Sequence, residues 1–270
     1  MRQYGGSQQQ PRRYSFHAVI FDLDGVVTDT ARIHSVAWKA LFDDYLRSAG
    51  ASGDPACAPF DIAKDYPTYV DGKPRYEGVR SFLTSRGFRL EYGNPGDPPE
   101  AETICGLGNR KDRLFTRLIH EGDVVVFEST VRLIHALAAV GVPRAVASSS
   151  RNCETVLRLT GLADLFDTRV DGVVSAELKL RGKPHPDIFL RCAEGLGVKP
   201  EHCVVMEDAI SGVEAGRDGR FGLVVGVDRV GQGGALSSHG ADVVVTDLSD
   251  VSPAVLDCWW LARNPGTKRA

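Results

Sequence analysis

The sequence predicts an α/β protein, in which a doubly wound parallel sheet carries a helical segment inserted after its first strand. The first observation is the continuous apolar run at residues 18–21, which is typical of a strand buried on both faces. The second is that strand-like and helix-like segments alternate after residue 122. The third is that residues 49–122 hold helical candidates among Pro-, Gly- and Asp-rich loops, but no convincing buried strand.

The spacing of apolar residues predicts the individual elements. Residues 31–48 carry two apolar stripes at helical spacing, so this helix should bury more than one face. Two more helices are expected within the insertion, at residues 76–86 and 110–120. Later helices are predicted at residues 130–140, from near Asn152 to before Gly161, and at 186–196, 211–218 and 251–261. Later strands are predicted at residues 144–147, 169–174, 203–206, 222–227 and 242–245, with a loop at 231–234.

The size and composition are those of an ordinary folded protein. A chain of 270 residues holds about two domains of typical length. Hydrophobic residues at 43% and charged residues at 25% exclude collagen-like, disordered and coiled-coil classes. We expect a disordered tail at residues 1–14, a core made of residues 15–30 and 128–265, and the inserted second domain at residues 31–127.

Charge and cysteine content exclude several kinds of partner. The 32 basic and 35 acidic residues give a net charge of −3, which disfavours broad binding to a nucleic-acid backbone. No stretch approaches the roughly 18–20 apolar residues that cross a bilayer, and the first 13 residues lack the apolar segment of a signal peptide. We therefore expect a cytoplasmic protein, as a monomer or weak dimer, that binds neither nucleic acid nor membrane. Its six dispersed cysteines are expected to be free thiols.

Polar side chains stand where four of the predicted segments end. Asp22 and Asp24 follow the first strand, three consecutive serines beginning at Ser148 follow the second, and Glu207 and Asp208 end the fourth. Lys183 comes after the third strand as part of a Lys-Pro pair. Because the carboxyl ends of parallel strands share one edge of a sheet, these groups should converge there.

This set of groups suits phosphate chemistry. Several carboxylates at one edge repel each other, and Mg²⁺ with oxygen ligands relieves that repulsion. A Ser hydroxyl and the Lys183 ammonium could hold phosphate oxygens. The spacing of Asp22 and Asp24 allows one carboxylate to attack phosphorus while the other handles a proton, and Gly25 permits the tight turn between them and the metal.

Four segments carry a resemblance to a known family. FDLDGVVTDT, AVASSSRN, GKPHPDIF and VVMEDAISGVEAG resemble, in order and spacing, the four motifs of the haloacid dehalogenase superfamily. FDLDGVVTDTARIHSVAWKAL and GKPHPDIF are similar to its β-phosphoglucomutase branch and to the phosphatase relatives of that branch. The resemblance covers about residues 18–247. It implies a Rossmann-like core and a mobile helical cap that closes over a small phosphorylated sugar.

The resemblance also implies roles for the core residues. Asp22 would be the nucleophile that becomes an aspartyl phosphate, and Asp24 the general acid/base. Ser148 would hydrogen-bond the transferring phosphoryl group, and Lys183 would neutralise it.

The same resemblance implies a magnesium site and a substrate site. Asp208, the Asp22 carboxylate and the Asp24 main-chain carbonyl would bind Mg²⁺, with Glu207 at the metal directly or through water. The residues expected to contact substrate are Thr30, His34, Arg75, Lys111, Ser149 and Asn152. Arg75 and Lys111 favour a phosphomutase, which must hold a second phosphate or a sugar hydroxyl on the cap side.

Other interpretations of these residues stay open at this point. A phosphatase for small sugar phosphates needs the same core and only has to admit water. A receiver-type phosphorylation switch also uses a strand-end Asp with Mg²⁺, a Ser or Thr and a Lys, although it needs neither the insertion nor Asp24. Ser148 could simply belong to a helix-capping turn, and Arg75 and Lys111 could be ordinary surface charges.

Overall fold

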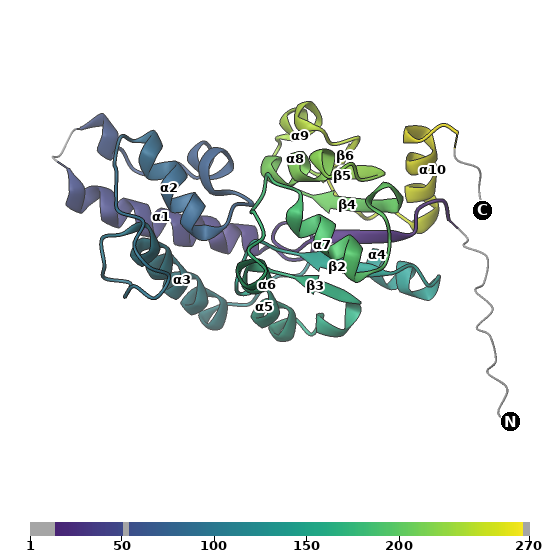
Figure 1. Cartoon of the computed structure of the whole chain (residues 1–270), viewed down its shortest axis with the longest axis horizontal. Helices are drawn as coiled ribbons and strands as arrows, with labels where there is room; N and C mark the ends of the chain where they lie inside the picture. The colour runs from purple at the N-terminus through teal and green to yellow at the C-terminus, as the bar shows by residue number, and fades with distance from the viewer. Residues whose placement is uncertain (1–13, 51–53, 267–270) are drawn as a thin grey trace, which may run out of the picture.

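The computed structural model describes residues 14–50 and 54–266 and has an α/β architecture (Figure 1). Most of the predicted tail, residues 1–13, lies outside this range. Within the described residues, six parallel strands form one sheet in the order β3-β2-β1-β4-β5-β6. The strands are β1 (Ala18–Asp22), β2 (Arg144–Ala147), β3 (Thr168–Val170), β4 (Cys203–Glu207), β5 (Leu223–Val227) and β6 (Val243–Val245). The predicted doubly wound parallel sheet is confirmed.

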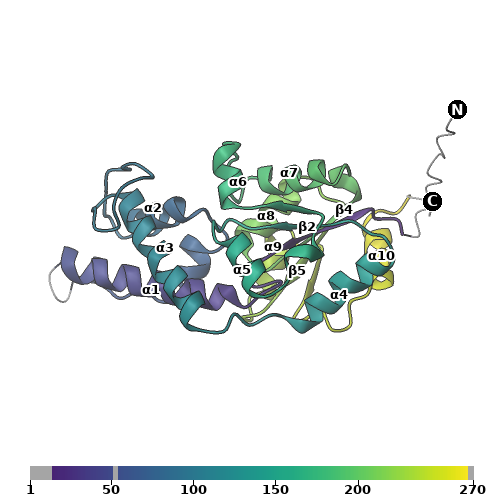
Figure 2. The same ribbon diagram turned by 90° about the horizontal axis from the view of Figure 1, so that it is seen from below.

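Helices cover both faces of this sheet (Figure 2). One face packs against α7 (Asp187–Gly195), α8 (Ile210–Asp218) and α9 (Gly233–His239). The other face packs against α4 (Glu128–Ala139), α5 (Cys153–Leu159) and α10 (Pro253–Arg263). Every residue of β1, β4 and β5 is buried, as expected for parallel strands between two helical layers.

The segment between β1 and α4 is helical and lies to one side of the sheet (Figures 1 and 2). It contains α1 (Thr30–Ala49), α2 (Arg75–Ser85) and α3 (Ile104–Glu121), the short helix η1 (Pro55–Cys57) and the π-helical turn η2 (Tyr66–Val70). We call the segment from α1 to α3 the helical part, and β1 with the turn after it together with the segment from α4 onward the sheet part. Aromatic residues dominate the core of the helical part, where Phe42 contacts Trp38, Phe60 and Phe82.

Two adjacent linkers join the helical part to the sheet part. Thr28 in the first linker forms an antiparallel bridge with Val126 in the second. Asp29 N donates to Val125 O at 2.9 Å, and Phe127 N donates to Val27 O at 3.0 Å. The linkers therefore run side by side at the carboxyl edge of β1, directly beside the predicted reaction site.

Two predictions differ from the structure: the length of the third strand and the extent of the loop at residues 231–234. The predicted strand at residues 169–174 was too long, since β3 ends at Val170 and α6 (Gly172–Glu177) follows. The Asp171 carboxylate caps α6 by accepting from the N–H groups of Val173 and Val174, which stops the strand. The loop predicted at residues 231–234 is also wrong, because α9 begins at Gly233.

The last helix of the insertion begins earlier than its periodicity predicts. Helix α3 starts at Ile104 rather than at residue 110, because the Thr103 hydroxyl accepts from Gly106 N at 2.9 Å as an N-cap. Two short 3-10 turns, η3 (Ala163–Leu165) and η4 (Pro200–His202), also escaped sequence analysis. All six cysteines fall among the described residues and are free, as predicted. None of the described helices has the length and apolar character needed to span a membrane.

Candidate active site

The strand order explains why the predicted polar groups meet. Strand β1 lies at the centre of the sheet between β2 and β4, with Asp22 in register with Ala147. Asp22 therefore ends β1 next to Ser148, which follows β2, and Glu207, which ends β4. All three side chains are buried. Residues far apart in the sequence thus share one site at the carboxyl edge of the sheet.

Lys183 joins two of these carboxylates. Its Nζ donates to Asp22 Oδ1 at 2.5 Å and to Glu207 Oε1 at 2.6 Å, and the Lys183 side chain is 1% exposed. Burial alone would lower the pKa of Lys183, but the two carboxylates raise it above its usual range. Burial raises the pKa of Asp22, with Lys183 opposing that effect. The ammonium is therefore fixed as a cation beside the carboxylate predicted to be the nucleophile.

Asp24 is held by a different set of groups. Thr30 Oγ1 donates to Asp24 Oδ1 at 2.5 Å, Ser148 Oγ donates to Asp24 Oδ2 at 2.8 Å, and His34 Nε2 lies 3.3 Å from Asp24 Oδ1. Burial would raise the pKa of Asp24, but His34 and the two hydroxyls hold it below its usual range. Asp22 and Asp24 thus have opposite pKa shifts, which is the pattern of two carboxylates with different chemical tasks.

The predicted magnesium ligands form an acidic group. One carboxylate oxygen each from Asp22, Glu207 and Asp208 lie within 4.8 Å of one another, and all three residues are buried. Asp208 Oδ1 is buried without a hydrogen-bond partner in the described part of the chain. Burial and the neighbouring carboxylates Asp71 and Glu207 raise the pKa of Asp208. An orphaned carboxylate oxygen among crowded carboxylates fits a hard divalent cation.

Two further details shape this acidic group. Gly25 has a φ of 98°, and a Cβ atom there would lie 1.7 Å from Asp208 Oδ2, so only glycine lets the β1 turn approach Asp208. Glu207 is more fully engaged than Asp208, because its Oε2 accepts from Asp208 N at 2.6 Å and from Ala209 N at 2.9 Å. The oxygen atoms of Asp208 are thus the more available ligands.

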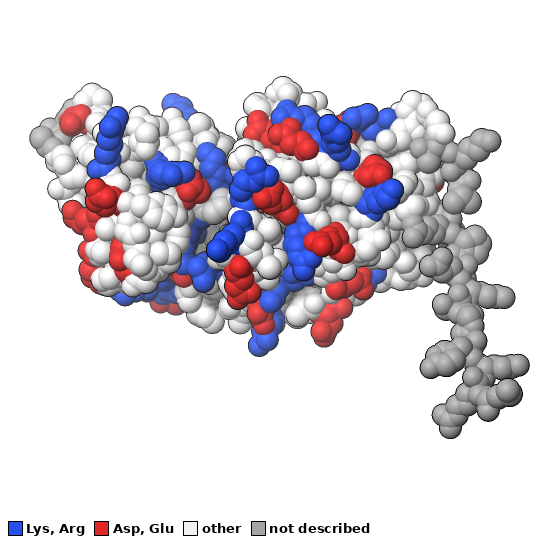
Figure 3. Space-filling view, in the orientation of Figure 1, with Lys and Arg blue, Asp and Glu red and all other residues white. Residues whose placement is uncertain are grey.

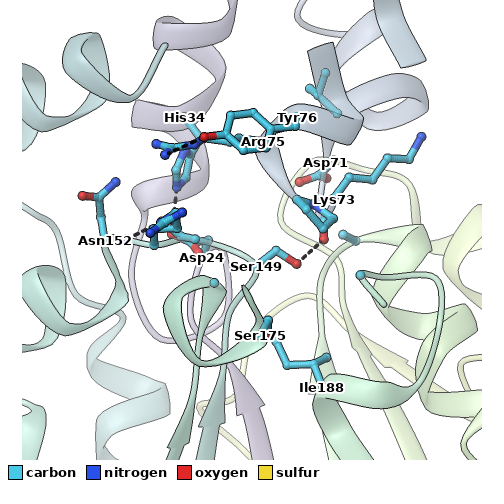
Figure 4. A pocket seen from close by; sticks show the side chains of 18 of the residues that line it. Asp24, His34, Asp71, Lys73, Arg75, Tyr76, Ser149, Asn152, Ser175 and Ile188 are labelled. Atoms are coloured by element: carbon cyan, nitrogen blue, oxygen red, sulfur yellow. Dashed lines mark hydrogen bonds and ion pairs between the residues drawn. The ribbon is translucent and has the colours of Figure 1, made fainter. Parts of the chain in front are cut away.

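A cavity of about 300 Å³ separates this edge of the sheet from the helical part. Figure 3 shows Lys and Arg side chains around the hollow between the two parts. Asp24 and Ser149 line the cavity from the sheet part, while His34, Arg75 and Lys111 line it from the helical part (Figure 4). The predicted residues Thr30, Ser148 and Lys183 do not line the cavity and instead contact Asp22 or Asp24 from behind.

His34 and Lys111 form a buried pair beside Asp24. Lys111 Nζ contacts His34 Nδ1, and the His34 ring stacks on Phe115 with centroids 3.9 Å apart. Lys111 Nζ also lies 5.0 Å from the centroid of the Trp38 ring. Burial, together with the Lys111 charge, lowers the pKa of His34, so a neutral ring accepts from Lys111 and presents Nε2–H to Asp24.

The remaining predicted substrate residues make contacts between the two parts. Arg75 Nη1 lies 2.6 Å from Asp112 Oδ2, and Asn152 Nδ2 donates to Asp112 Oδ1 at 2.8 Å. Ser149 Oγ donates to the Gly72 carbonyl at 2.6 Å. Ser149 and Asn152 therefore connect the sheet part to the helical part in this structure.

Comparisons with known proteins agree with this geometry. The sequence model of the haloacid dehalogenase-like hydrolase family matches residues 16–219. A β-phosphoglucomutase of Mycobacterium bovis is 51% identical over 237 residues, which cover 87% of this chain and 90% of that protein. The chain belongs to the haloacid dehalogenase-like hydrolase family.

Two other relatives of this haloacid dehalogenase-like hydrolase extend the comparison. A phosphorylated carbohydrates phosphatase of Thermotoga maritima is 30% identical over 233 residues, covering 84% of this chain and 93% of that protein. A solved β-phosphoglucomutase structure from Clostridium difficile superposes with a TM-score of 0.74 at 26% identity, covering 92% of this chain and 98% of that chain. The chain is thus an enzyme of the β-phosphoglucomutase-like type, and the receiver-type switch is not retained.

Sequence analysis of this haloacid dehalogenase-like hydrolase missed Asp71. This residue lines the cavity between η2 and α2, and burial together with Glu207 raises the pKa of Asp71 to about 7. Its carbonyl accepts from Ser211 Oγ at 2.9 Å, which fixes the loop against the sheet part. The signal available in the sequence was the string DGKPR, in which Asp71 stands four residues before Arg75.

The buried Lys111 of this haloacid dehalogenase-like hydrolase should make its stability depend on pH. Burial lowers the pKa of Lys111 from 10.5 to about 7. The folded state therefore binds fewer protons than the unfolded state between these values, and the destabilisation caused by Lys111 decreases as pH rises. We expect Lys111→Met to gain melting temperature over wild type at pH 7 and to lose most of that gain by pH 10.

Thermal unfolding at several pH values measures this difference. Lys199→Met is the matched control, because Lys199 has a 77% exposed side chain and should show no such trend. A melting-temperature difference for Lys111→Met that stays constant from pH 7 to pH 10 would contradict the expectation.

Proposed function

We propose that this enzyme is a β-phosphoglucomutase, which transfers a phosphoryl group on a small sugar phosphate through an aspartyl phosphate at Asp22. The observation that carries the proposal is the pair Asp22 and Asp24, two carboxylates that line one cavity and have different partners. Asp22 accepts from Lys183, whereas Asp24 accepts from the Thr30 and Ser148 hydroxyls. The 51% identical relative is itself named a β-phosphoglucomutase. The predicted roles of the site residues are retained as parts of this proposal.

The chemistry requires Asp22 and Asp24 to act in turn. An Asp22 oxygen attacks the phosphorus of a phosphate ester, the bond from phosphorus to the sugar oxygen breaks, and protonated Asp24 gives its proton to that oxygen. In the reverse half, ionised Asp24 takes a proton from a sugar hydroxyl as that oxygen attacks the aspartyl phosphate. Thr30, Ser148 and His34 hold Asp24 in its ionised form, which suits the second half.

The residues at the sheet edge fit the predicted magnesium ion. Asp22 and Asp208 would hold it, with the Asp24 carbonyl as the further predicted ligand and Glu207 at the metal directly or through water. When bound, Mg²⁺ would offset the negative charge of the phosphoryl oxygens. Lys183 contributes a second positive charge beside Asp22, which favours the ionised nucleophile and opposes the effect of burial.

We further propose that residues 31–127 act as a cap on a core made of residues 15–30 and 128–265. Two hydrogen bonds between the linkers, and contacts such as that from Ser149 Oγ to the Gly72 carbonyl, hold the two parts together around the cavity. Closing the two parts over a bound sugar phosphate would exclude water, which favours transfer to a sugar hydroxyl over hydrolysis. The monomer or weak dimer and the cytoplasmic location stay predictions.

A product assay tests this function. Purified enzyme with Mg²⁺ and a glucose 1,6-bisphosphate primer is expected to convert β-glucose 1-phosphate into glucose 6-phosphate, followed by a coupled dehydrogenase. Release of inorganic phosphate without any glucose 6-phosphate would overturn the proposal. That outcome would instead support the second candidate, a sugar-phosphate phosphatase, which the similarity to the phosphorylated carbohydrates phosphatase favours.

Asp24→Asn should separate proton transfer from metal binding. The amide cannot exchange the proton, so we expect turnover to fall by about 10²–10⁴-fold. The Asp22, Glu207 and Asp208 carboxylates remain, so Mg²⁺ affinity measured by calorimetry should change little. Loss of Mg²⁺ binding together with activity would show that Asp24 acts through the metal site instead.

A further inference from the structure

Asp112 lies between the helical part and the sheet part, in contact with a cation and an amide that could both hold an oxyanion. Its Oδ2 lies 2.6 Å from Arg75 Nη1, and its Oδ1 accepts from Asn152 Nδ2 at 2.8 Å. Arg75 belongs to α2, Asp112 to α3, and Asn152 immediately precedes α5. All three residues line the cavity (Figure 4 labels Arg75 and Asn152). One carboxylate thus bridges two groups from opposite walls that would both suit an oxyanion.

The ion pair between Asp112 and Arg75 leaves two nitrogen atoms of the guanidinium, Nε and Nη1, without a hydrogen-bond partner among the residues described. The contact at Nη1 is an ion pair without hydrogen-bond geometry, and Arg75 Nε is buried without a partner among the residues described. Tyr76 also contacts the guanidinium: the guanidinium carbon lies 5.2 Å from the Tyr76 ring centroid, and Arg75 Nη2 donates to Tyr76 Oη at 3.5 Å. A phosphate, with more charge and three acceptor oxygens, could bond to the planar fork of Arg75 at two points and would bind better than Asp112.

Asp112 can leave this position at modest cost. Its side chain is 33% exposed, so water can solvate the carboxylate once an incoming anion displaces it. Lys111, the preceding residue of α3, is 4% exposed and stays with His34. The movable group is therefore Asp112, while the side chains around it are fixed.

We propose that Asp112 is an internal competitor for the substrate's anionic group at Arg75, and that it thereby sets selectivity for sugar phosphates whose far end carries a phosphate. This inference rests on the proposed function, because it assigns the cap end of the same cavity. A phosphate that displaces Asp112 gives Arg75 a new anionic partner. A neutral hydroxyl that displaces Asp112 breaks the ion pair and leaves Arg75 without an anionic partner. Asp112 is a selectivity residue and takes no part in the bond-making steps.

Asp112→Asn tests this inference, because the amide keeps an acceptor for Asn152 and removes the charge beside Arg75. We expect KM for β-glucose 1-phosphate to fall by about three- to tenfold with kcat changed less than twofold, since a competing anion has been removed. Asp65→Asn is the matched control: Asp65 pairs with Arg86 at 2.9 Å in the helical part, is partly buried like Asp112, with its side chain 13% rather than 33% exposed, and lies outside the cavity lining. Its KM should equal that of wild type.

A binding measurement keeps the test independent of turnover. Titration with inorganic sulfate, followed by calorimetry, should give a lower Kd for Asp112→Asn than for wild type or Asp65→Asn. Asp112→Ser should shift Kd in the same direction if the Asn variant folds poorly. An unchanged or raised KM and sulfate Kd would overturn the inference and show that Asp112 orients Arg75 instead. If wild type forms no glucose 6-phosphate, the proposed function fails while the sulfate result still decides the role of Asp112.

Discussion

Asp22→Ala is expected to lower turnover by at least about 10⁴-fold and to abolish formation of the phosphoenzyme. The Asp22 carboxylate ends the central strand, and Lys183 Nζ contacts it at 2.5 Å. Asp24, the nearest carboxylate in sequence, is held by Thr30 and Ser148 in an acid/base position. Without Asp22, we therefore expect no side chain of the site to replace it as nucleophile.

The fold should survive this substitution. Burial raises the pKa of Asp22, so ionising it in the folded state is unfavourable, and Lys183 keeps Glu207 as a partner at 2.6 Å. Phosphoenzyme is measured by mass spectrometry after brief exposure to glucose 1,6-bisphosphate, and turnover by glucose 6-phosphate formation. Asp167→Ala is the control, since Asp167 pairs with Arg144 at the amino end of β2. Normal phosphorylation of the Asp22→Ala protein would refute the assignment.

Lys183→Met should cause the largest loss of stability among single substitutions at this site. The Lys183 side chain is 1% exposed and separates two buried carboxylates, Asp22 and Glu207. Its removal leaves both without a cation, and breaking a buried ion pair in this way costs about 3–5 kcal/mol. Activity should disappear as well, because the positive charge beside the nucleophile is lost.

The pH dependence of this variant follows from the same charges. In wild type the pKa of Lys183 is raised above 10.5, so its stabilising effect is fully present below that pH. In Lys183→Met the effect of burial, which raises the pKa of Asp22, would no longer be opposed by a cation, so the folded state binds more protons than the unfolded chain. The stability loss relative to wild type should therefore be larger at pH 8 than at pH 5.

Urea unfolding without divalent cations at pH 5 and pH 8 measures this effect. Lys199→Met provides the control, because Lys199 is exposed and pairs loosely with Glu201 at 3.9 Å. A stability loss for Lys183→Met that is equal at the two pH values would contradict the expected effect of pH on the Asp22 carboxyl.

Most of the sheet part could be predicted from the sequence because its signals are local. Short apolar runs predict β1 and β4, and each strand ends at a carboxylate residue: β1 at Asp22 and β4 at Glu207. Once parallel strands are predicted, their carboxyl ends must share an edge, so the convergence of these groups follows. The predicted end of β3 was wrong because the apolar pattern continues beyond the strand, whereas the Asp171 side chain caps α6 and so ends β3.

The cavity wall of the helical part could be predicted only in fragments. Arg75, Lys111 and His34 were singled out, but neither the pair of Lys111 with His34 nor the partner of Arg75, Asp112, could be predicted, because the members of each pair come from different helices. Asp71 was missed because it follows a π-helical turn, whose irregular backbone leaves no repeating pattern. The helical part was harder to predict than the sheet part because packing between helices depends on contacts between residues distant in sequence.

The sequence by itself therefore determined the fold class, the family resemblance and which polar residues meet at the sheet edge, because strand ends are specified by neighbouring residues. Only the tertiary structure decided which charged side chains pair with each other in the cavity and at the sheet edge. It showed that Lys183 serves both Asp22 and Glu207, and that Asp112 rather than solvent faces Arg75. Burial and distance set these pairings through desolvation and Coulombic attraction, and neither quantity is encoded in the spacing of residues along a chain.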